Sequence, residues 1–139
     1  MSWFSDLFKQ KQVVSLADAV FGPIMFEHGI WTFLPKKPED GFLIGVDAPE
    51  AGPSAKQRNF FKQVRSELHA YEQKAREYMA SRVDSSVKVA SLSTYSVQIG
   101  DEVATQREEF VLELSDENAF IVHRVSFRAG QPVDYGFDD

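Results

Sequence analysis

The chain has 139 residues, of which 43% are hydrophobic, with no cysteine and a formal net charge of −6. This length predicts a single domain over residues 1–139, with enough apolar material for a core that needs no disulfide or structural metal. The missing cysteines exclude disulfides, thiolate metal sites and a cysteine nucleophile, and the negative charge argues against nucleic-acid binding by the whole chain.

Residues 1–12 read MSWFSDLFKQKQ and place Trp3, Phe4, Leu7 and Phe8 at helical spacing. This spacing predicts a short amphipathic helix that either packs on the core of this protein or rests on a membrane surface or a partner. No run of 18 apolar residues and no cationic lead with an apolar stretch is present, so we expect no transmembrane helix or signal peptide and a cytoplasmic location.

The first strands are predicted in FGPIMFEHGIWTFLP, where two apolar runs flank Glu27-His28-Gly29. Gly29 can adopt the positive φ that a tight hairpin turn needs. After a polar turn, FLIGV predicts a third strand, so we expect a three-stranded meander that ends at Asp47.

The stretch DAPEAGPSAKQRNFF predicts a turn followed by the start of a helix. Ser54 stands three residues before Gln57, which is the spacing of a capping box. Apolar residues then recur at steps of three and four, so one long helix is predicted over residues 54–82. This segment carries seven Lys or Arg against three Glu, which indicates either a solvated helix face or a surface for an anionic partner. The helix start could also attract an anion, but it lacks a glycine-rich cradle.

After Asp84 the apolar period changes from helical to two. Four strands are predicted in VKVASLSTYSVQI, EEFVLEL, AFIVHRVSF and QPVDYGF. Pro132 cannot donate to a ladder, so the last strand should be an edge. If the turn SDEN joins two paired strands with a loop of two or four residues, the alternation predicts that they bury one shared face, formed by Phe110, Leu112, Leu114, Ile121, His123, Val125 and Phe127.

The predicted fold class is therefore α+β, with a mainly antiparallel sheet. We expect a three-stranded meander, a long helix packed on the sheet and a four-stranded meander, preceded by the short N-terminal helix. No internal repeat or linker divides the chain.

Histidines are the first candidates for a chemical site. His28 falls in a predicted turn, His69 on the solvent side of the helix and His123 on an apolar strand face. His123 is either a hydrogen-bonded core residue or a residue lining a pocket between helix and sheet. None of the three has a partner at metal-ligand spacing, and the sequence contains no serine-hydrolase elbow, phosphate loop or dinucleotide fingerprint. We therefore predict no catalytic residue, metal or cofactor.

Carboxylates near the C-terminus are the second group of candidates. An acidic surface steers association with a basic partner. We predict that five acidic residues contribute to binding: Glu109, Glu113, Asp134, Asp138 and Asp139.

Three stretches carry a resemblance to known proteins: FGPIMFEHGIWTF, GPSAKQRNFF and FIVHRVSFRAGQPVDYGFDD. With them the chain resembles a loose group of uncharacterised small bacterial α+β domains, some of them similar to immunity proteins that neutralise toxins. The resemblance implies an antidote or interaction module, with no catalytic residue to carry over.

Three hypotheses about function follow from the sequence. The first is a non-catalytic protein-binding module, immunity-like in character, whose partner is a basic protein. The second is a small ligand-binding domain or enzyme that uses His123 with a carboxylate or tyrosine. The third is a peripheral membrane or assembly factor held by residues 1–12. No nucleic-acid partner is expected, and unpaired edge strands leave a homodimer open.

Overall fold

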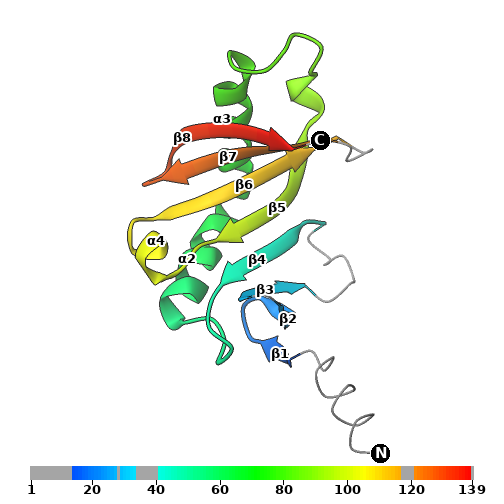
Figure 1. The fold of residues 1–139 in the computed structure, drawn as a ribbon. Helices are drawn as coiled ribbons and strands as arrows, with labels where there is room; N and C mark the ends of the chain where they lie inside the picture. The colour runs from blue at the N-terminus through cyan, green and yellow to red at the C-terminus, as the bar shows by residue number, and fades with distance from the viewer. Residues whose placement is uncertain (1–13, 28, 34–40, 117–120, 139) are drawn as a thin grey trace, which may run out of the picture.

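The computed structural model describes residues 14–27, 29–33, 41–116 and 121–138. These residues form one eight-stranded sheet whose strands lie in chain order, from β1 at one edge to β8 at the other (Figure 1). The strands are β1 (Val14–Asp18), β2 (Gly22–Glu27), β3 (Ile30–Phe33), β4 (Leu43–Asp47), β5 (Ser93–Ile99), β6 (Glu109–Ser115), β7 (Val122–Arg128) and β8 (Gln131–Asp138). The helical elements are α2 (Ala55–Ser66), α3 (Leu68–Ala80), the short 3₁₀ helix η1 (Val89–Ser91) and α4 (Glu102–Gln106).

The predicted fold class is wrong in its topology. The two meanders are joined into a single mixed sheet, because β4 pairs with β5 in parallel while every other described pair is antiparallel. A parallel pair requires a crossover connection, and α2 and α3 provide it between β4 and β5. Strand, helix and strand follow one another here, so this order in the sequence was the available signal for the parallel pair.

Three short elements are also missing from the prediction: β1, α4 and η1, which replaces the first part of the strand predicted from Val87. β1 adds an eighth strand, paired with β2 from Val14↔Phe26 to Asp18↔Gly22. α4 follows β5, and Asp101 caps it by accepting a hydrogen bond from the backbone N–H of Ala104 at 2.9 Å. This capping role was not predicted, although an Asp directly before a short helix is a typical N-cap.

The predicted long helix is interrupted at Glu67. This residue has φ −113° and ψ 20°, and its N–H is shared between the carbonyls of Gln63 and Val64 at 3.3 and 3.2 Å. No proline or glycine causes the break. On its two sides the packing shifts along the sheet: α2 contacts Phe21 through Phe61 and Phe110 through Phe60, whereas Tyr71 of α3 contacts Phe110 and Phe127. The interruption lets the two helices cover different parts of a twisted sheet.

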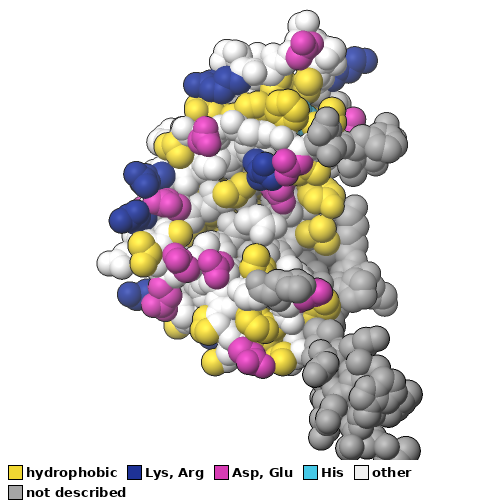
Figure 2. Space-filling model, viewed as in Figure 1, with side chains coloured by type: hydrophobic (Ala, Val, Ile, Leu, Met, Phe, Trp, Pro, Cys, Tyr) yellow, Lys and Arg dark blue, Asp and Glu magenta, His cyan; other side chains and the backbone are white. Residues whose placement is uncertain are grey.

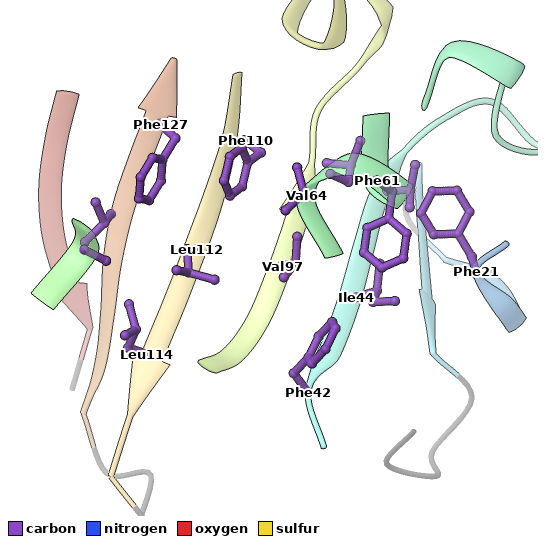
Figure 3. Packing of buried hydrophobic residues seen from close by; sticks show 14 of the residues in the cluster. Phe21, Phe42, Ile44, Phe61, Val64, Val97, Phe110, Leu112, Leu114 and Phe127 are labelled. Carbon is purple, nitrogen blue, oxygen red and sulfur yellow. The ribbon is translucent and has the colours of Figure 1, made fainter. Parts of the chain in front are cut away.

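The core lies between the sheet and the helix layer, which is our name for α2 and α3 together. Figure 3 shows labelled side chains of β4 to β7 on one side of the sheet, where Phe61 and Val64 of α2 meet them. The predicted shared face of β6 and β7 is confirmed for three opposed pairs, Phe110 with Phe127, Leu112 with Val125 and Leu114 with His123. It is wrong for Ile121, which lies just before β7 and is 40% exposed. The predicted position of the last strand is also confirmed, since β8 forms the edge.

Several predictions fall on residues that the structure does not describe. They are the amphipathic segment 1–12, the turn at His28 and the carboxylate of Asp139. Within the described ranges, no helix has the length and apolar character needed to cross a membrane.

Candidate functional site

The start of α2 is held by one buried glutamine. The predicted capping box is confirmed, since Ser54 Oγ accepts from the Gln57 N–H and Gln57 Oε1 accepts from the Ser54 N–H. Gln57 Nε2 also donates to the carbonyls of Asp47 and Gly100, at 2.8 and 2.9 Å. Ligands often bind at the carboxyl ends of parallel strands. Here the amide of Gln57 fills that place between β4 and β5, so this region serves the fold.

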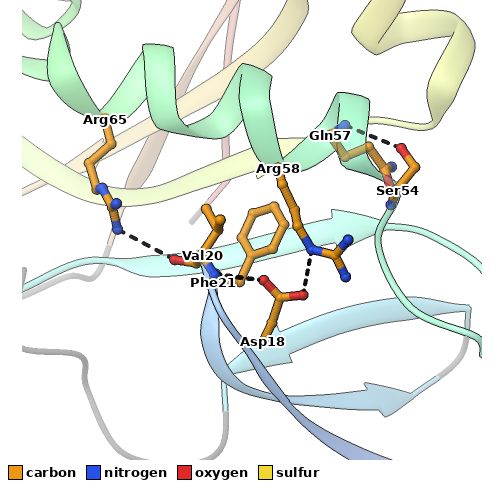
Figure 4. A network of polar contacts seen from close by, with 7 residues as sticks. All are labelled: Asp18, Val20, Phe21, Ser54, Gln57, Arg58 and Arg65. Carbon is orange, nitrogen blue, oxygen red and sulfur yellow. Dashed lines mark hydrogen bonds and ion pairs between the residues drawn. The ribbon is translucent and has the colours of Figure 1, made fainter.

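The basic side chains of the helix layer serve the fold as well. Arg58 Nε donates to Asp18 Oδ2 at 2.8 Å, and the same carboxylate accepts the N–H groups of Val20 and Phe21 at 2.9 and 3.0 Å (Figure 4). The side chain of Asp18 is only 1% exposed. Arg65 reaches the carbonyl of Val20 at 3.5 Å. These contacts connect α2 to the turn between β1 and β2.

Two cations of α3 bind backbone carbonyls in the half of the sheet formed by β5 to β8. Lys74 Nζ donates to the carbonyl of Gly130 at 2.8 Å, and Arg76 Nη1 donates to that of Leu92 at 3.0 Å. Arg82, in the turn after α3, folds back on that helix, where its guanidinium lies 3.5 Å from the ring centre of Tyr78. Five of the seven basic side chains of residues 54–82 therefore have a structural partner, and only the exposed Lys56 and Lys62 lack a described one.

The opposite side of the sheet has a different character, and we call it the open face. In Figure 1 α2 and α3 lie behind the sheet, so the reader looks onto this face, where Figure 2 shows acidic and hydrophobic side chains interspersed. The strand register places six carboxylates and two arginines on it, a formal charge of −4. These residues are Glu27, Asp47, Glu109, Glu113, Asp134, Asp138, Arg124 and Arg128.

The four described carboxylates that the sequence predicted for binding all lie on this face. Glu109 pairs with Arg128 Nη2 at 2.7 Å, and Asp138 accepts a hydrogen bond from Arg124, which lowers the pKa of Asp138. Glu113 accepts a hydrogen bond from the hydroxyl of Ser96. Asp134 is exposed and has no described partner. The predicted acidic surface thus contains two arginines that the sequence reading did not place there.

A groove of about 490 Å³ crosses this face. Asp47 and the Glu109–Arg128 pair lie along its rim, and its lining is mainly apolar. The residues that contribute apolar or small side chains on this side are Ile30, Ala104, Val111, Ser126 and Val133. The groove was not predicted from the sequence, in which only the inward apolar positions and the acidic residues of these strands were assigned a role. The alternate positions of the same strands were the signal for it.

Gln98 forms part of the groove floor and depends on Gly45 of the neighbouring strand. A Cβ atom on Gly45 would lie 2.0 Å from Gln98 Oε1, so only a glycine allows the glutamine to lie across β4. Gln98 Nε2 donates to Ser96 Oγ at 3.0 Å, and Ser96 donates to Glu113. This chain of hydrogen bonds fixes the floor of the groove.

His123 lies on the other side of the sheet and lines a second cavity, of about 410 Å³. The cavity is bounded by the loop that contains Ser86, Lys88 and Leu92 and by the ends of β6 and β7, not by helix and sheet as predicted. His123 is 5% exposed, and its Nδ1 lies 2.7 Å from the hydroxyl of Tyr135. It is therefore both a hydrogen-bonded core residue and a residue at a cavity.

Burial lowers the pKa of His123, although the charge of Asp116 acts in the opposite direction. Burial also raises the pKa of Tyr135. The pair is thus a neutral imidazole beside a neutral phenol at pH 7. His69, by contrast, lies with its side chain fully exposed on α3, as predicted.

The part of the chain that the structure describes contains no group of three or more histidine, aspartate or glutamate side chains arranged for a metal ion. The protein was also compared with known proteins. No family model, no curated protein sequence and no solved structure matches the chain.

Proposed function

We propose that the protein is a non-catalytic module that binds another protein through the open face of its sheet. The observation that supports this proposal is the uneven use of charge. The cations of the helix layer are engaged within the fold, while the open face keeps a formal charge of −4 beside exposed apolar side chains. Such a surface attracts a basic partner and offers it apolar contact area.

Immunity-like neutralisation of a basic toxin, such as a nuclease, is the specific form of this proposal that an acidic surface favours. Electrostatic steering by such a face falls as salt rises, because the Debye length shortens from about 10 Å at 0.1 M to about 3 Å at 1 M. Binding should therefore weaken with ionic strength.

The proposal is tested by capture of partners from native lysate, at low and high salt, with three forms of the protein. Asp134→Lys reverses one charge on the open face, and Glu77→Lys makes the same reversal at an exposed position of α3. We expect one basic protein to bind the wild type and Glu77→Lys and to be lost with Asp134→Lys. Equal capture by all three forms would contradict a role for the open face.

His123 supports a second candidate function, a small-ligand site or enzyme. A buried, neutral histidine at a cavity is typical of functional sites, and its contact with Tyr135 provides the tyrosine that the sequence hypothesis required. The test is a ligand screen that monitors the ring resonances of His123. Saturable changes that disappear in a variant with Lys88→Ala would favour this function, since Lys88 lines the same cavity.

The third hypothesis concerns residues 1–12, which lie outside the described residues. Attachment to a membrane or an assembly by this segment stays a prediction from the sequence. Deletion of residues 1–12 followed by cell fractionation tests it, and an unchanged distribution would eliminate it.

A further inference from the structure

We infer that the partner presents an extended basic segment, which lies across the strands in the open-face groove with an apolar side chain between two cationic ones. This inference rests on the proposed function and names the class of partner for the same face. Three properties of the groove carry it: its direction, its charged ends and its apolar centre.

The groove runs across the strands. Each of the six consecutive strands from β3 to β8 contributes at least one residue to its lining. Neighbouring strands lie about 4.8 Å apart, so the four intervals from β4 to β8 span about 19 Å. A surface that extends across this many strands suits an extended segment of chain.

A carboxylate without a described partner lies toward each end. Asp47 is exposed at the end of β4, beside Ile30. Asp134 is exposed on β8, beside Val133 and opposite Ser126. Glu109 differs from both, because Arg128 already neutralises it. Cationic side chains of a partner would therefore pair first with Asp47 and Asp134.

The centre of the groove is apolar. Val111 lies on the floor, and Ile30 and Val133 are 41% and 54% exposed at the two sides. The volume of about 490 Å³ lies within the range of roughly 300–1,000 Å³ that ligand pockets occupy. It is large enough to receive an aromatic or large aliphatic side chain.

The spacing of the partner's residues follows from these dimensions. An extended chain advances about 3.3 Å per residue, so about 19 Å corresponds to about six positions. The segment should therefore carry Lys or Arg about six positions apart, with its apolar residue near the middle.

A peptide titration tests the inference. The probe is a seven-residue peptide with lysine at both ends, phenylalanine in the centre and serine elsewhere, added to the full-length ¹⁵N-labelled protein at low salt. We expect saturable amide shifts at Gln98, Val111, Ser126 and Val133. A peptide with glutamate at both ends should produce none, and one with serine in the centre should bind more weakly.

Two pairs of protein variants separate the effect of filling the groove from the effect of removing charge. Ser126→Trp fills the groove without changing any charge and should abolish the shifts, whereas Ser15→Trp adds the same ring to the same face on β1 and should not. Asp47→Asn and Asp134→Asn should each weaken binding by about two- to fivefold, as expected for exposed ion pairs. Retained stability of each variant is checked by thermal unfolding.

Three results would overturn the inference: no shifts with the lysine peptide, shifts that lie on α2 and α3, or unchanged binding by Ser126→Trp. If the titration fails while Asp134→Lys still loses the partner captured from lysate, the groove assignment is wrong and the proposed function stands. If neither the peptide titration nor the capture from lysate responds to substitutions on the open face, both the groove assignment and the proposed function are wrong.

Discussion

The helix layer and the open face carry opposite charges, and the fold uses those charges differently. Arg58, Lys74 and Arg76 donate to a buried carboxylate or to carbonyl groups at strand ends and turns. On the open face, Asp47 and Asp134 have no described partner. Charge engaged inside a fold supports its stability, whereas charge left exposed is available to a partner. The basic helix face predicted from the sequence is thus mainly a structural device.

The largest expected effect is that of Gln57→Ala. It leaves the part-buried carbonyls of Asp47 and Gly100 and the N–H of Ser54 without their partner at the junction of β4, β5 and α2. Since each unsatisfied buried group costs about 1–3 kcal/mol, we expect a loss of about 3 kcal/mol in the free energy of unfolding. Urea denaturation measures it. Gln63→Ala, at an exposed position of the same helix, is the matched control and should change stability by less than about 0.5 kcal/mol.

Asp18→Ala should have the next largest effect, a loss of about 2 kcal/mol, because it removes the buried acceptor of three hydrogen bonds. Burial acts to raise the pKa of Asp18, but the N–H groups of Phe21 and Val20 and the guanidinium of Arg58 outweigh it, so the pKa lies below 3.8.

A carboxylate whose pKa is lowered by folding stabilises the folded state fully when the pH is above its pKa in the unfolded chain. This contribution is lost as the pH falls through its pKa in the folded state. The wild type should therefore lose stability below about pH 3.8 more steeply than Asp18→Ala does. Asp134→Ala, which removes an exposed carboxylate, is the control. It should leave the free energy of unfolding at pH 7 unchanged and keep the acid sensitivity of the wild type. Equal acid sensitivity of wild type and Asp18→Ala would contradict this explanation.

His123 should make a smaller contribution that depends on pH. Because its pKa lies below 6.5 in the folded state, the unfolded chain binds more protons as the pH falls below 6.5, and stability decreases there. His123→Gln should remove this step, and calorimetry at several pH values between 7 and 5 measures it. His69→Gln is the control for loss of an exposed histidine and should leave stability at pH 7 unchanged.

The smallest effect is a coupling of about 1 kcal/mol between Gly45 and Gln98 on the groove floor. A methyl group at position 45 forces the glutamine away and breaks its hydrogen bond to Ser96. Gly45→Ala should therefore destabilise the wild type more than it destabilises Gln98→Ala. A double-mutant cycle measures the difference, and strictly additive effects would contradict the packing of Gln98 over Gly45.

Local features of the fold were predictable from the sequence because local chemistry determines them. Ser54 and Gln57 form their capping box, Phe110 and Phe127 share a face, and Pro132 lies in an edge strand. The parallel pairing of β4 with β5 was not predicted, since it joins segments separated by two helices. The break at Glu67 carries no proline or glycine signal.

The candidate site was predicted only in part. Glu109, Glu113, Asp134 and Asp138 were predicted as acidic binding residues, and the strand register places all four on the open face. Their neighbours across the strands depend on register, which is why the pairing of Glu109 with Arg128 and of Asp138 with Arg124 was not foreseen. The groove itself requires six strands to lie in order, which no local pattern specifies.

The division of roles between the two faces can be measured directly with two double variants, each of which removes two charges. Arg58→Gln with Arg76→Gln removes two positive charges from the helix layer, and Asp47→Asn with Asp134→Asn removes two negative charges from the open face. For each, the free energy of unfolding and the affinity for the lysine–phenylalanine–lysine peptide are measured together. We expect the helix-layer variant to lose about 2 kcal/mol of stability with its peptide affinity retained, and the open-face variant to show the reverse. A stable helix-layer variant that no longer binds the peptide, or an open-face variant with unchanged affinity, would contradict this division.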